Sequence, residues 1–75
     1  GETQFKYYRI TIFDDRHRLI KRTGRLVPDQ TDALSILLNP GFFRPGDYSL
    51  IIEGIKKEGG QEAVSNYLFR IIKAR

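Results

Sequence analysis

Residues 45–54 have the sequence PGDYSLIIEG, and this stretch decides the fold class. Pro45 and Gly46 predict a tight corner, since proline fixes φ and glycine tolerates positive φ. Tyr48 begins a run in which every second residue is apolar, which is the period of a strand with one buried face. A tyrosine directly after such a corner is typical of β-sandwich domains, where the ring is buried and the hydroxyl bonds to backbone. We therefore predict that Pro45, Gly46 and Tyr48 form a structural corner.

The same alternation recurs along the rest of the chain. It predicts five antiparallel strands, at residues 5–14, 18–22, 33–38, 47–55 and 64–72. Polar turns or turns rich in Gly and Pro separate these strands. The sequence thus predicts one all-β domain over residues 1–75, in which residues 1–4 form a flexible or tag-derived start.

Two segments also fit a helix. Apolar residues recur at helical spacing within residues 62–73, and Thr31 and Asp32 could cap a short helix that runs to Leu38. Two such helices would give the element order ββαβα. We favour strands, because Phe69 would face solvent on the first helix and Pro40 ends the second after only about two turns.

The composition limits the chemistry available to the chain. Its 75 residues are 40% hydrophobic and 12% aromatic, which is typical of one small globular domain. The absence of Cys excludes disulfides and thiolate metal sites. No apolar run approaches the roughly 20 residues that span a membrane, so we expect no membrane span within this chain.

The residues that could carry catalysis do not form a recognisable group. His17 is the only His, and the sequence around it contains neither a catalytic triad nor a set of metal ligands. Asp14 and Asp15 are adjacent and are expected to stabilise a turn, since an Asp side chain can bond to the backbone two residues on. Gly59 and Gly60 lack the strand–glycine–helix context of a phosphate loop and predict a hairpin turn. We therefore expect a non-enzymatic protein without cofactor or metal ion.

Basic residues gather around the first predicted hairpin. The chain has a net charge of +4, and such a cluster favours an anionic partner, with Tyr7 and His17 available for stacking. The other interpretation is an ordinary solvated surface that discourages aggregation at a sheet edge. The candidate anion-binding residues are Arg16, Arg18, Lys21, Arg22 and Arg25.

Two sequence stretches carry a resemblance to a known domain. They are DALSILLNPGFFRPGDYSLIIEG at residues 32–54 and YLFRI at residues 67–71. The chain resembles, over about residues 8–72, the immunoglobulin-like domain that ends many zinc-finger-bearing, anti-sigma-type envelope proteins of bacteria. The P-G-x-Y corner also occurs in fibronectin-III-like domains. The matching residues are Leu34, Ile36, Leu38, Pro45, Gly46, Tyr48, Leu50, Gly54, Tyr67, Phe69 and Arg70.

This resemblance implies an immunoglobulin-like β-sandwich and a periplasmic or extracellular location. It does not extend to the zinc finger, because the chain has no Cys and one His. A complete sandwich of this type has about seven strands in about 100 residues, whereas five are predicted here. The two missing strands would precede Tyr8, and their absence would leave a sheet edge unpaired and invite another chain to complete the sandwich.

The predicted outer face of the strands is unusually apolar. The candidate interface residues are Tyr7, Ile51, Leu68 and Ile72, with Phe5 nearby. Scattered exposed apolar residues are common, but together with the missing strands they favour self-association as a homo-oligomer or polymer, with the first or the last strand at the contact. The leading hypothesis is therefore an interaction or assembly module. The alternative is a small basic β-barrel that binds nucleic acid or another polyanion, with Phe5, Tyr7 and Arg9 on one sheet face.

Overall fold

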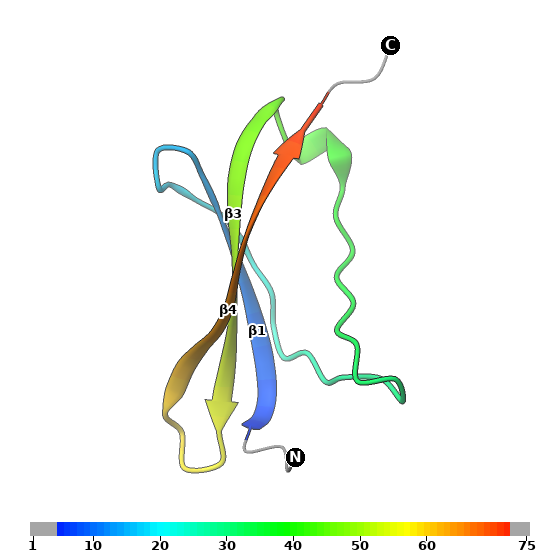
Figure 1. Cartoon of the computed structure of the whole chain (residues 1–75), viewed down its shortest axis with the longest axis vertical. Coiled ribbons are helices and arrows are strands. Elements are labelled where there is room, and N and C mark those ends of the chain that lie inside the picture. Colours follow the sequence, from blue (N-terminus) through cyan, green and yellow to red (C-terminus); the bar gives the residue numbers. More distant parts are fainter. Residues whose placement is uncertain (1–4, 73–75) are drawn as a thin grey trace.

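Four strands of the described part of the chain, residues 5–72 of this computed structural model, form one antiparallel sheet (Figure 1). The order across the sheet is β2-β1-β3-β4. The strands are β1 (Phe5–Asp14), β2 (Leu19–Arg22), β3 (Gly46–Lys56) and β4 (Gln61–Ile71), and a 3-10 turn, η1 (Pro40–Phe42), precedes β3. The predicted all-β class is confirmed, since these residues contain no α-helix.

The C-terminal segment is a strand and not a helix. β4 pairs antiparallel with β3 from Gly46↔Ile71 to Ile55↔Gln61. The register skips Val64, because Ile52 faces Ser65 while the next residue of β3 faces Ala63. This bulge breaks the two-residue period at Val64. Beyond it, the exposed Leu68 and Ile72 supply the further apolar positions that also fit a helical template. The strand predicted at residues 64–72 is therefore confirmed as far as Ile71, where β4 ends. The alternative, a helix over residues 62–73, is excluded up to residue 72, and residue 73 lies outside the described residues.

The third predicted strand does not join the sheet. Residues 33–38 belong to the long connection between β2 and β3, which runs along one side of the sheet and returns through η1 (Figure 1). The predicted alternation is nevertheless present, with Leu34, Ile36 and Leu38 half-buried and Ser35 and Leu37 exposed. The described residues thus form four strands and one sheet, where five strands were predicted, because the connection crosses a sheet face and does not lie beside an edge. A short helix over residues 31–38 is also absent.

The core lies between the sheet and this connection. Ile10 and Ile12 of β1 are 3% and 0% exposed. Both face the same side as their β3 neighbours, Ile52 and Leu50, because directly paired residues share a face. From the connection, the side chains that pack against this cluster are Leu26, Ile36, Leu38 and Phe43. We call the opposite side of the sheet the open face. Its residues include Tyr7, Arg9, Thr11, Ile51, Glu53 and Leu68.

A bulge at the start of β1 moves Phe5 off the open face. The register shifts between Phe5 and Tyr7, so that Phe5 pairs with Lys56 and lies on the core side. Its ring sits directly on Gly54, where a Cβ atom would collide with it, and 5.6 Å from the Tyr8 ring. The prediction that Phe5 joins Tyr7 and Arg9 on one face is therefore wrong.

Candidate functional site

The corner before β3 is built as the sequence predicts. The Tyr48 hydroxyl donates a hydrogen bond to the Arg44 carbonyl oxygen at 2.6 Å, and the residue is only 7% exposed. The Tyr48 ring stacks on Phe69 at 5.4 Å and meets the edge of Phe43 at 5.3 Å. Gly46 has a φ of 150°, a conformation that glycine adopts without strain. Tyr48 thus ties the end of the connection to the sheet.

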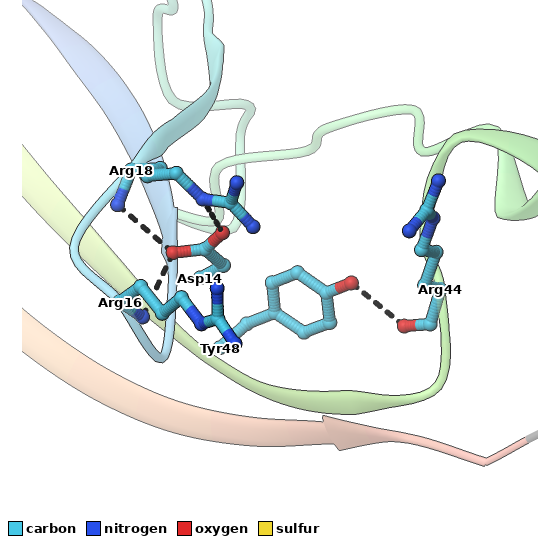
Figure 2. Close-up of polar contacts among 5 residues, drawn as sticks. All are labelled: Asp14, Arg16, Arg18, Arg44 and Tyr48. Atoms are coloured by element: carbon cyan, nitrogen blue, oxygen red, sulfur yellow. Dashed lines mark hydrogen bonds and ion pairs between the residues drawn. The ribbon is translucent and has the colours of Figure 1, made fainter.

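The turn between β1 and β2 is organised by Asp14. Its Oδ1 accepts hydrogen bonds from the backbone N–H groups of Arg16 and Arg18, both at 2.9 Å, and its Oδ2 accepts one from Arg18 Nε at 2.8 Å (Figure 2). These bonds, led by the Arg18 backbone N–H, hold the pKa of the Asp14 carboxyl below its usual value. His17 completes the turn with a φ of 62°. The predicted turn role of Asp14 is confirmed.

The lowered pKa of Asp14 predicts an acid-sensitive turn. Because the folded state favours the carboxylate, its stabilising effect is present above the unfolded-state pKa of about 3.9 and is lost as the pH falls through the lower folded-state value. Asp14→Asn keeps one oxygen that accepts from both backbone N–H groups, but it removes the charge and the Oδ2 acceptor of Arg18 Nε. We expect this variant to have a lower urea midpoint than the wild type at pH 7. The difference should begin to shrink near pH 4 and disappear only below the lowered folded-state pKa of Asp14. Asp15→Asn is the control, and an equal effect from both changes at every pH would contradict the prediction.

A wide hollow lies between this turn and the corner. Figure 2 shows the Tyr48 ring between Asp14 on one side and the Arg44 carbonyl on the other. The hollow measures about 700 Å³, and its charged lining consists of three arginines and three aspartates, namely Arg16, Arg18, Arg44, Asp14, Asp15 and Asp47. Arg18 is paired with Asp14, and Asp47 is paired with Arg70 at 2.7 Å. The lining side chains of this charge-balanced hollow therefore carry no net charge in sum.

The predicted basic cluster is divided among three places. Arg16 and Arg18 line the charge-balanced hollow, whereas Lys21 lines a separate hollow with Asn39 and Phe42. The other two residues, Arg22 and Arg25, come together on the open face with residues of β1. That third hollow measures about 540 Å³ and is lined by Tyr7, Arg9, Arg22, Thr23, Gly24 and Arg25. The sequence prediction did not include Arg44, and it placed Arg9 beside Tyr7 only in the alternative of a polyanion-binding barrel, not in the basic cluster.

The predicted interface residues differ in their exposure. Tyr7 is half-buried, with the Arg25 guanidinium 5.0 Å from its ring centre, and Ile51 is half-buried in the middle of the sheet. Leu68, in contrast, is 85% exposed on β4, and Ile72 just beyond it is 79% exposed. β1 lies between β2 and β3, so the first strand is not at an edge. The contact candidates that remain are therefore on the last strand.

The outer edge of β4 is a second unusual feature. Within residues 5–72, β4 pairs only with β3, so the other side of this 11-residue strand has no ladder partner. The central stretch from Ala63 to Phe69 contains no charged side chain. Tyr67 is 57% exposed and Leu68 is 85% exposed. Sheet edges of soluble proteins are usually protected by Lys, Pro or a covering segment, and this stretch has none of these among the described residues.

The segment from Leu34 to Leu38, which we call the lone segment, has the third unusual feature. Its backbone N–H and C=O groups make no hydrogen bond to any residue that the structure describes. Both of its ends are nevertheless fixed. Before it, Asp29 Oδ1 accepts bonds from the N–H groups of Thr31 and Ala33, and after it, Asn39 Oδ1 accepts one from Gly41. The lone segment thus lies between two fixed ends, outside the four strands, and has no ladder partner among residues 5–72.

Known proteins offer no guide to this chain, since no family model matches it and no curated protein or solved structure is significantly similar to it. No helix within residues 5–72 has the length and apolar character needed to cross a membrane. The same residues contain no cluster of three or more His, Cys, Asp or Glu side chains that could hold a metal ion.

Proposed function

We propose that this chain is a non-enzymatic interaction module that assembles with further copies of itself by strand pairing. The observation that supports this most directly is the lone segment. Five consecutive residues, Leu34–Leu38, alternate between half-buried and exposed, as in a strand, and their amides have no partner within residues 5–72. Backbone groups of an extended chain normally bond to a neighbouring strand. A strand added to the lone segment would pair these groups, as in recognition by β-augmentation.

The outer edge of β4 in a second copy is the partner that we propose for the lone segment. The lone segment and the stretch of β4 from Ala63 to Phe69 both lack charged side chains. Their contact would therefore involve no repulsion between like charges and no removal of water from a charged group. Both also expose leucine, with Leu37 91% and Leu68 85% exposed. Because each copy carries one lone segment and one β4 edge, the contact is head-to-tail. Such contacts generate rings or open polymers.

The proposed assembly would complete a sandwich. In the described residues the second layer consists of a single connection over the core face of the sheet. An immunoglobulin-like sandwich, which the sequence resembles, has several strands in each sheet. A neighbouring β4 beside the lone segment would add a strand to this second layer. We also propose that the domain works in the cell envelope or the extracellular space, as its sequence resemblance implies.

The test replaces Leu37, whose side chain is 91% exposed, so that neither change removes a buried group. Leu37→Pro deletes one of the unpaired N–H groups and places a ring where a second strand would lie. Leu37→Thr keeps the N–H and a β-forming side chain. In sedimentation velocity at about 100 μM, we expect the wild type and Leu37→Thr to associate and Leu37→Pro to be monomeric. A monomeric wild type, or equal association of all three, would contradict the proposal.

A further inference from the structure

The hollow on the open face brings together arginines from two segments. β1 contributes Tyr7 and Arg9, and β2 with the residues after it contributes Arg22 and Arg25. Between Arg22 and Leu26 the chain has one residue more than the facing part of β1, and backbone bonds fix it on either side of this irregularity. Thr23 exchanges bonds with Ile10, since its N–H donates to the Ile10 carbonyl and its Oγ1 accepts from the Ile10 N–H, both at 2.9 Å. Three residues later, Leu26 and Tyr8 exchange backbone bonds of 2.8 and 2.9 Å.

The three arginines of this hollow have no counter-charge in its lining. Arg9, Arg22 and Arg25 make no ion pair with any carboxylate of residues 5–72, and no Asp or Glu lines the hollow. The nearest acidic residue across the ladder is Glu53, which is the register partner of Arg9 and accepts a 3.4 Å bond from the Thr11 hydroxyl. The lining of this one hollow thus carries three positive charges and no negative charge, and an anion bound there would offset them.

Two of the arginines are oriented by neighbouring groups. Arg22 Nε donates to Thr11 Oγ1 at 3.4 Å, and its terminal nitrogens make no hydrogen bond to the described residues. Arg25 lies over the Tyr7 ring, 5.0 Å from its centre, in a cation–π contact. Such contacts reduce the number of conformations that a long side chain must give up on binding. The planar fork of arginine also matches the oxygens of phosphate and sulfate groups.

We propose that this hollow binds a phosphate-type oxyanion with at least two negative charges, through Arg9, Arg22 and Arg25. The arginines would contact the oxygens of the ligand and not a nucleobase. Sites that recognise single-stranded nucleic acid by its bases stack them on exposed aromatic rings. Tyr7 is the single aromatic residue in the lining of this hollow, and it is half-buried and faces the Arg25 guanidinium.

The test is a titration with inorganic pyrophosphate at low ionic strength, followed by amide chemical shifts and by thermal shift. We expect saturable shifts centred on residues 7–9 and 22–25 and a rise in the melting temperature, since a ligand stabilises the state that it binds. Arg22→Gln with Arg25→Gln should weaken binding at least tenfold. The control, Arg16→Gln with Arg44→Gln, removes the same two charges from the charge-balanced hollow and should change the affinity less than twofold.

A parallel titration with a ten-residue oligothymidylate distinguishes the possible sources of the phosphate. If both ligands bind and both depend on Arg22 and Arg25, the natural ligand includes a phosphate chain such as a nucleic-acid backbone. The affinity for oligothymidylate should then fall more steeply with salt concentration than the affinity for pyrophosphate. If pyrophosphate alone binds, the site is for a small anion. If both pairs of substitutions weaken binding equally, the affinity depends only on the net charge of the protein, and the proposal is wrong. The absence of saturable pyrophosphate binding would also overturn it. Melting of the ligand-free variants at the wild-type temperature shows that they are folded.

Discussion

Replacing Tyr48 with Ala is expected to lower the free energy of unfolding by about 3–5 kcal/mol, which is the usual cost of truncating a buried aromatic side chain. The Tyr48 ring is packed between Phe43 and Phe69, so its removal leaves a cavity between the sheet and the connection. A domain of this size typically has a total stability of about 4–11 kcal/mol. Tyr48→Ala should therefore bring the protein close to unfolding at room temperature.

Two further substitutions separate the contributions of the Tyr48 ring and its hydroxyl. Tyr48→Phe keeps the ring but leaves the Arg44 carbonyl without its 2.6 Å hydrogen bond, and should cost about 1 kcal/mol. Tyr67→Ala removes a tyrosine from the same sheet face that is 57% exposed, and it should cost less than about 1 kcal/mol. Urea titration of the four proteins measures these values. Similar small effects of all three substitutions would show that the corner does not hold the connection to the sheet.

The corner could be predicted from the sequence because its determinants are local. Pro45 and Gly46 fix the bend, and the alternation that begins at Tyr48 selects which side of β3 is buried. The Asp14 turn and the glycine turn between β3 and β4 were predictable for the same reason, since Asp bonds to nearby backbone and Gly59 adopts a φ of 100°.

The remaining features depend on contacts between distant residues. The alternation in the lone segment correctly gave its inward side chains, but alternation alone does not say whether a strand has a ladder partner. Single-residue bulges changed the faces of Phe5 and of the start of β4. The basic cluster was predicted as one site because its residues are close in sequence. The pairing of β1 with β2 and with the residues after it divides this cluster and brings Arg9 beside Arg22 and Arg25.

The energy of the proposed assembly requires both backbone pairing and side-chain burial. A net hydrogen bond contributes about 0.5–1.5 kcal/mol, so a ladder along the five residues of the lone segment offsets only part of an association cost of about 4–15 kcal/mol. Burial of exposed apolar side chains must supply the rest, at about 25 cal/mol per Å². Leu68 is the most exposed apolar side chain of β4. Leu68→Glu, which also places a charge in the uncharged stretch, should therefore weaken self-association at least tenfold.

A mixture of two blocked variants is expected to form a 1:1 dimer although each variant alone is a monomer. Leu37→Pro blocks the lone segment and leaves the β4 edge intact, whereas Leu68→Glu blocks the edge and leaves the lone segment intact. In a head-to-tail contact the two proteins retain one complementary pair of surfaces, which forms a dimer and cannot extend into a polymer. Sedimentation velocity of the separate and mixed proteins at about 100 μM measures this outcome. If two lone segments pair with each other instead, Leu68→Glu alone still dimerises; if two β4 edges pair, Leu37→Pro alone does so. Either result would refute the head-to-tail contact and identify the surface that replaces it.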